Sequence, residues 1–120
     1  MTSASMFTEE QEKFAVDQSK FLDEDCNEGI CPACGRKSLR TYAYHTENRV
    51  RKSVVTYMWC FSCRKMKTWL GADAIGVAFS DPLGNYSLAE RKEMESDIEA
   101  FLHRLDQLWS SGELPQKKLH

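Results

Sequence analysis

The chain has 120 residues, of which 42% are hydrophobic and 11% are aromatic. This length accommodates one compact domain rather than two, and the composition excludes a globally disordered chain. No stretch approaches the roughly 20 apolar residues that cross a bilayer, so the sequence predicts no transmembrane helix.

The net charge of −2 conceals three segments of different sign. Residues 1–30 carry two lysines against eight acidic residues, whereas residues 31–70 carry nine basic residues against one acid. Residues 71–120 carry five basic and nine acidic residues. A basic centre between acidic arms predicts either an anionic partner for the centre or internal pairing between the centre and the arms.

In the N-terminal region, the sequence predicts a helix over residues 8–22, because Thr8 and Gln11 form a capping box. Its aromatic residues recur every seven positions and are expected to dock the helix on the rest of the domain: Phe7, Phe14 and Phe21. The first residues show neither the basic start nor the apolar core of a secretory signal. We therefore expect a cytoplasmic protein.

Two C-x-x-C pairs mark the centre of the chain, Cys31 with Cys34 and Cys60 with Cys63. In a reducing compartment, paired cysteines bind metal more often than they form disulfides, and four thiolates suit tetrahedral Zn²⁺. A rubredoxin-type iron site and a pair of disulfides remain alternatives. Because four thiolates leave no position for water or substrate, we expect the zinc to be structural.

Two other potential metal ligands are expected to have no part in the site. Cys26 is the odd cysteine and is expected to be a free thiol, although a spare ligand is the alternative. His45 lies midway along the predicted hairpin, far in register from both cysteine pairs.

Three strands are predicted around the cysteine pairs. Residues 39–46 alternate in polarity, and residues 50–59 are rich in β-branched and aromatic side chains, so together they predict an antiparallel hairpin. Residues 65–70 predict a third strand. Residues 71–86 form a connector, and residues 87–110 predict one long amphipathic helix, capped by Ser87.

The two cysteine pairs, the hairpin between them and the third strand resemble the zinc-ribbon superfamily over Gly29 to about Leu70. This resemblance implies an α+β fold with a small antiparallel zinc β-ribbon, flanked by an N-terminal helix and a long C-terminal amphipathic helix. The whole chain, residues 1–120, is expected to form a single domain.

The second half of the chain carries W-C-F-S-C-R at the second cysteine pair and ends its helix with L-W-S-S-G-E-L-P. In these features it resembles small zinc-ribbon proteins of actinobacteria, some of which accompany toxins as immunity partners. This resemblance implies a function through protein–protein contact, but it transfers no binding residue.

The ribbon combines cations that suit phosphates with aromatic rings that suit bases, which is typical of a surface for single-stranded nucleic acid. Alternatively, the rings are the core of a small sheet and the cations are neutralised by the acidic arms. The candidate binding residues are Arg40, Tyr42, Tyr44, Arg49, Arg51, Lys52, Tyr57, Trp59, Arg64, Lys65, Lys67 and Trp69.

No Gly-rich phosphate loop, His-Glu motif or Ser/His/Asp constellation is present, so we expect no enzymatic activity. We favour a binding protein that acts through protein contact, including inhibition of a toxin, over a nucleic-acid-binding or transcription-associated module. The long C-terminal helix also offers a surface for a homodimer. The two hypotheses differ in whether the helices cover the basic, aromatic face of the ribbon or leave it exposed.

Overall fold

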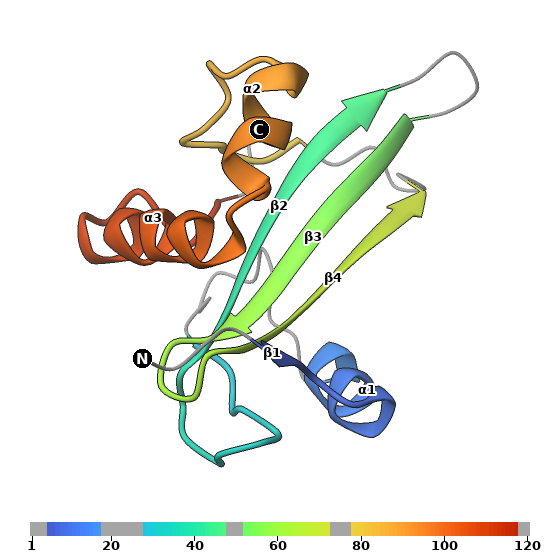
Figure 1. Cartoon of the computed structure of the whole chain (residues 1–120), viewed down its shortest axis with the longest axis vertical. Helices are drawn as coiled ribbons and strands as arrows, with labels where there is room; N and C mark the ends of the chain where they lie inside the picture. The colour runs from blue at the N-terminus through green and yellow to red at the C-terminus, as the bar shows by residue number, and fades with distance from the viewer. Residues whose placement is uncertain (1–4, 18–27, 48–51, 73–77, 118–120) are drawn as a thin grey trace.

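A four-stranded sheet forms the centre of the computed structural model, which describes residues 5–17, 28–47, 52–72 and 78–117 (Figure 1). The strand order is β1-β4-β3-β2. The strands are β1 (Ser5–Met6), β2 (Leu39–Glu47), β3 (Lys52–Cys60) and β4 (Lys65–Ala72). The helices are α1 (Glu9–Asp17), α2 (Leu88–Glu95) and α3 (Ile98–Ser110).

The predicted three-stranded antiparallel ribbon is confirmed. Strand β3 pairs with β2 on one side and with β4 on the other, both antiparallel. Strand β1 then adds a short parallel pairing to β4 at Lys65 and Met66, which no sequence pattern indicated. The α+β class and the presence of helices at both ends of the ribbon are confirmed as well.

The sheet has two differently covered faces. On the helix face, large side chains of β2, β3 and β4 pack against α3: Tyr42, Tyr44, Tyr57, Trp59 and Met66 with Phe101, Leu102, Leu105 and Leu108. On the opposite face, a smaller cluster contains Phe7, Cys31, Leu39, Met58 and Cys60. Because this cluster includes a cysteine from each C-x-x-C turn, or knuckle, we call this side of the sheet the knuckle face. Because side chains alternate along a strand, this division follows from the period-2 pattern of the sequence.

The segment 87–110 is helical, but the single long helix expected there is two helices. Ser87 and Glu90 form the predicted capping box of α2. Asp97 interrupts the helix, since its side chain accepts a hydrogen bond from the Ala100 amide and acts as the N-cap of α3. Aspartate competes with helical hydrogen bonding in this way, so it starts a new helix here.

The N-terminal helix is described only over Glu9–Asp17, and residues 18–22 of the predicted span lie outside the described residues. Phe7 is buried in the knuckle-face cluster, but Phe14 is half exposed. The expectation that all three rings dock the helix is therefore wrong for Phe14, and Phe21 lies outside the described residues. None of the helices among the described residues is both long enough and apolar enough to span a membrane.

A buried polar cluster ties α2 to the sheet. Arg91 donates to Asp81 Oδ2 (2.7 Å), to the Tyr42 hydroxyl (2.8 Å) and to the Leu83 carbonyl (2.8 Å). Its guanidinium also lies over the Tyr44 ring, 4.3 Å from the ring centroid. Arg91 is thus fully engaged inside the protein although it belongs to an otherwise polar helix.

The outer edge of β2 is covered at two points by segments from elsewhere in the chain. Gly29 exchanges two backbone hydrogen bonds with Leu39. The side-chain amide of Gln116 reproduces a neighbouring strand at Ala43, accepting from its N–H (2.9 Å) and donating to its carbonyl (2.6 Å). These contacts satisfy backbone groups that an edge strand otherwise leaves free.

Candidate metal centre

The four cysteines of the C-x-x-C pairs converge at one end of the ribbon, with all sulfur atoms within 4.8 Å of one another. The Cys31 and Cys63 sulfurs lie 3.6 Å apart, as do those of Cys34 and Cys60. A disulfide needs a separation of about 2.0 Å, whereas the sulfurs of a tetrahedral Zn–S₄ site lie about 3.8 Å apart. The cluster is positioned to bind a metal ion, as the sequence predicted.

The two knuckles, residues 31–35 and 60–64, share one backbone conformation. The amide of Gly35 donates to the Cys31 carbonyl (2.9 Å), and the amide of Arg64 donates to the Cys60 carbonyl (3.1 Å). Both Gly35 and Arg64 have positive φ, 75° and 64° respectively. Glycine adopts this region without penalty, but for arginine it costs about 1–2 kcal/mol.

Backbone and side-chain donors surround the sulfurs. The Ala33 amide donates to Cys31 Sγ and the Cys63 amide to Cys60 Sγ, each at 3.3 Å. The Ser38 hydroxyl lies 3.0 Å from Cys60 Sγ. Such donors stabilise thiolates and orient the ligands of a metal.

The thiols differ in acidity. Burial alone would raise the pKa of Cys60, but hydrogen bonds from Ser38 and from the Cys63 amide outweigh it and lower the pKa to about 7. Burial raises the pKa of Cys31 to about 12 and also raises the pKa of Cys63. A metal ion that binds the cluster therefore displaces protons from the more weakly acidic thiols.

A second buried cluster joins the metal end of the ribbon to α3. Asp106 Oδ1 accepts from Arg40 Nη1 (2.8 Å) and from Trp59 Nε1 (2.9 Å), and Oδ2 accepts from Arg64 Nη1 (2.8 Å). The Arg40 guanidinium also lies over the Phe61 ring, 4.3 Å from its centroid. One carboxylate thus holds a residue of β2, a residue of β3 and a residue of the second knuckle.

The candidate binding residues do not form one exposed surface. The aromatic side chains Tyr42, Tyr44, Tyr57 and Trp59 are buried under the C-terminal helices, and Trp69 is half buried on the knuckle face. This placement agrees with the alternative in which the rings are the core of the sheet. The rings are not presented to a ligand in this structure.

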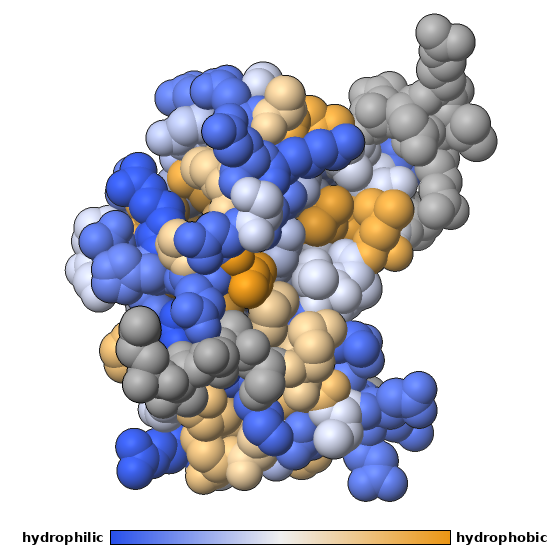
Figure 2. All heavy atoms as spheres, viewed as in Figure 1, coloured by the Kyte–Doolittle hydropathy of each residue, from blue (hydrophilic) through white to orange (hydrophobic). Residues whose placement is uncertain are grey.

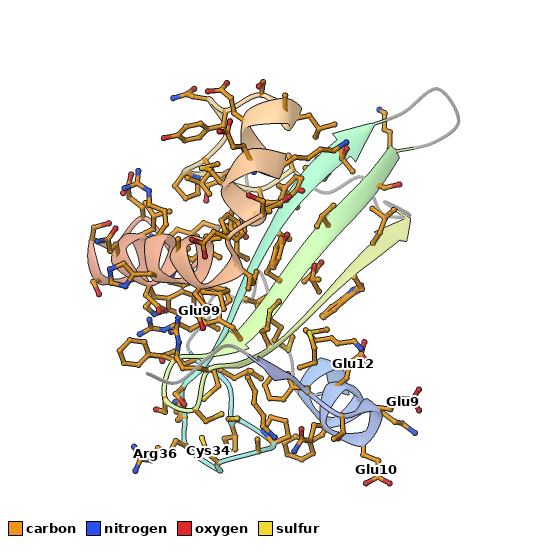
Figure 3. All side chains as sticks on the ribbon, in the orientation of Figure 1. Glu9, Glu10, Glu12, Cys34, Arg36 and Glu99 are labelled. Atoms are coloured by element: carbon orange, nitrogen blue, oxygen red, sulfur yellow. The ribbon has the colours of Figure 1, made fainter. Side chains whose placement is uncertain are left out.

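The candidate cations have several different environments. Arg40 and Arg64 pair with Asp106, and Lys67 Nζ lies 3.4 Å from Glu12 Oε2 on α1. Lys52 is exposed and Lys65 is half buried. Arg49 and Arg51 lie outside the described residues, as does Cys26. Figure 3 shows Arg36, which was not among the candidates, pointing outward beside Cys34 at the tip of the first knuckle.

His45 is not part of the cysteine cluster, as expected, because its ring stacks on Phe79 with 4.4 Å between the centroids. Sequence reasoning missed Asp106, Arg91 and Gln116. Asp106 did leave one sign, since it follows Leu102 by four residues and so falls on the apolar stripe of α3. An acid in that stripe indicates a buried cationic partner.

Comparisons of the chain with protein-family models, with curated proteins and with solved structures gave no match. The fold and the cysteine cluster therefore carry the functional interpretation by themselves.

Proposed function

We propose that this chain is a non-enzymatic zinc-ribbon protein that acts through contact with another protein. The observation that carries the proposal is the covering of the helix face by α2 and α3. The rings that would stack on bases are buried there, and two of the cations that would bind phosphates, Arg40 and Arg64, are paired with Asp106 and Glu28. The surface typical of a nucleic-acid-binding ribbon is used inside the protein instead.

Zinc is the proposed metal, with Cys31, Cys34, Cys60 and Cys63 as its ligands. The sulfur separations suit a tetrahedral ion, and four thiolates form the closed donor set of structural zinc sites. Because the knuckles contain few apolar side chains, the metal would supply much of the stability of this end of the ribbon.

The zinc proposal is tested by replacing one ligand. The Cys60→Ser variant is expected to bind no zinc and to lose the ordered knuckles, since Cys60 is fully buried and receives several hydrogen bonds. The Cys26→Ser variant is the matched control and should retain one zinc ion per chain. Metal content by mass spectrometry under native conditions distinguishes them, and full zinc occupancy in Cys60→Ser would refute the proposal.

Two features of the surface support protein contact. Phe14 and Ile30 are half exposed beside a cavity of about 530 Å³ between α1 and the first knuckle. Glu9 and Glu10 extend outward from α1 (Figure 3). Apolar groups flanked by charge are typical of protein-binding surfaces, and outward carboxylates favour association with a basic partner.

The specific partner proposed is a toxin with a basic active site, which the outward carboxylates would occlude in the manner of an immunity protein. Each gene next to the one for this chain would be expressed in a bacterial host with and without it. We expect one product to stop growth and this chain to restore it, whereas Cys60→Ser should not. If none of these products is toxic, or none is neutralised, the immunity role is wrong.

Nucleic-acid binding remains the second candidate, because Arg36 and Lys37 are exposed at the first knuckle. Fluorescence anisotropy with single-stranded DNA and RNA at low salt tests it. The protein-contact proposal predicts no binding. Tight binding that weakens with salt and is lost in an Arg36→Ala/Lys37→Ala variant would favour the second candidate instead.

A further inference from the structure

The outer backbone groups of the sheet are blocked at two separate points along β2 but only at the beginning of β4. At β2, the outward backbone groups of Leu39 and Ala43 are bonded by Gly29 and Gln116. At β4, the Phe7 amide donates to the Met66 carbonyl (2.9 Å), and the pairing with β1 ends there. Figure 1 shows no strand beside β4 beyond that point.

The bond from Phe7 fixes which residues of β4 point their backbone outward. Because hydrogen-bonding direction alternates along an antiparallel strand, Thr68, Leu70 and Ala72 share the outward direction of Met66. Within the part of the chain that the structure describes, no hydrogen bond reaches the outer N–H and C=O groups of Thr68 and Leu70.

This stretch of edge also lacks the charges that normally prevent strands from pairing. Residues 68–72 read T-W-L-G-A, without a charged residue. Leu70 is 57% exposed, and it lies opposite the half-buried Val55 on β3. Figure 2 shows hydrophobic side chains at the surface in the region that β3 and β4 occupy in Figure 1. An uncharged apolar edge is a template for a further strand.

We propose that β4 pairs with β4 of a second copy of this chain, antiparallel and around a two-fold axis at Leu70. Leu70 would then exchange both backbone hydrogen bonds with its own counterpart, and Thr68 would do so with Ala72 of the partner copy. The register also places Trp69 opposite the partner's Gly71, a combination in which an aromatic ring covers a glycine.

Self-pairing is favoured over the strand of a different protein by the symmetry of these features. The central residue presents both a donor and an acceptor, and an uncharged segment does not repel its own copy. The larger part of the C-terminal helix, the dimer surface expected from the sequence, is α3, whose apolar side chains pack against the chain's own sheet. This inference does not depend on the identity of any other partner.

The zinc-loaded chain should associate weakly, because one strand pair is smaller than a standard protein interface. Sedimentation velocity between about 5 and 500 µM is expected to show a monomer–dimer equilibrium. Leu70→Lys should raise the dissociation constant at least about tenfold, because two lysines would face each other at the axis. Leu88→Lys, the same change at an exposed leucine of α2, is the matched control and should leave it unchanged.

A mixing experiment tests the symmetry itself. Leu70→Lys and Leu70→Glu should each be monomeric alone, whereas an equimolar mixture should dimerise because lysine then faces glutamate. In the unmodified chain, the Leu70 amide should exchange more slowly with solvent as concentration rises, while the Trp69 amide, which faces β3, should not change.

Three results would each overturn the proposal. These are an unmodified chain that stays monomeric, equal dimerisation of Leu70→Lys and Leu88→Lys, and a mixture of the two Leu70 variants that remains monomeric. In the first case the edge would be left to the strand of another protein. The exchange measurement decides the question even if a Leu70 variant folds poorly.

Discussion

Arg64 occupies a backbone conformation that glycine would adopt more easily, and its contacts explain why arginine stands there. Its positive φ directs the side chain of the second knuckle to Asp106 on α3, where the ion pair measures 2.8 Å. The neighbouring Arg40 holds the other oxygen of the same carboxylate. The backbone penalty at Arg64 is offset by a contact that joins the metal end of the ribbon to the C-terminal helix.

Replacing Asp106 with asparagine should lower the free energy of unfolding by about 3 kcal/mol, because Arg64 would lose its anionic partner and the buried Arg40 would keep only Glu28, whose Oε2 lies 3.2 Å away. The amide oxygen of the new side chain would retain an acceptor for Trp59, whereas its NH2 group would face the Arg64 donor, so the loss combines the missing charge with one broken hydrogen bond. Urea unfolding of the zinc-loaded protein measures it. Asp97→Asn, on the same helix, is the control, since asparagine caps a helix as well as aspartate does. Equal stability of the two variants would contradict a central role for Asp106.

At the scale of elements, the segment after α3 covers part of the edge of β2 with a side chain and forms no strand of its own. Gln116 is 1% exposed, and its side chain bonds both backbone groups of Ala43 as well as the Ser80 carbonyl. One glutamine thereby fixes the segment after α3 against β2 and against the connector before α2. The edge of β2 is blocked at Ala43 without a further strand.

The Gln116→Ala variant should lose about 2–3 kcal/mol of stability, because the buried N–H and C=O of Ala43 would be left without partners. Gln107→Ala, at an exposed position of α3, should change stability by less than about 0.5 kcal/mol. Thermal unfolding of both variants tests the difference. A loss at residue 116 no larger than at residue 107 would show that the edge does not need the amide.

The strands were predicted to within a few residues because alternating polarity and β-branched runs are local features of the sequence. The break at Asp97 was missed, since the apolar spacing continues from Met94 through Ile98 to Phe101 and conceals it. The cysteine cluster was predictable because its spacing is a property of the ligands alone. The partners of Asp106 were not, since Arg40 lies 66 residues away in sequence.

At the scale of the whole molecule, some of the separated charge of the sequence is paired internally. Asp106 of the acidic C-terminal arm holds two arginines of the basic centre, and Glu12 of the N-terminal arm faces Lys67. The core between the ribbon and the helices also has polar contacts at its margins, where tyrosine hydroxyls donate hydrogen bonds to carboxylates. Tyr42 donates to Asp81 and Tyr44 to Glu95.

The protein should lose stability steeply in alkaline solution. Burial raises the pKa of Tyr42, Tyr44 and Tyr57 above the ordinary tyrosine value. Above about pH 10 the unfolded chain therefore releases three protons that the folded chain retains, so the free energy of unfolding falls by about 4 kcal/mol per pH unit. Below pH 10 these tyrosines should have no effect.

Urea unfolding at several pH values between 9 and 11, with tyrosinate absorbance as a second signal, tests this expectation. The Tyr57→Phe variant removes one of the three groups and should reduce the slope by about one third. A free energy of unfolding that stays constant above pH 10 would contradict the burial of these hydroxyls.

The closure of β2 by Gln116 has a consequence for biosynthesis. A ribosome makes the residue only after every strand and helix described here has been translated. Until then, a nascent chain that had already formed the hairpin would present the open backbone groups of Ala43 at β2 in addition to those of β4. Neighbouring nascent chains on one messenger RNA carry the same open edges, so this interval is the one in which mispairing between chains is most favoured.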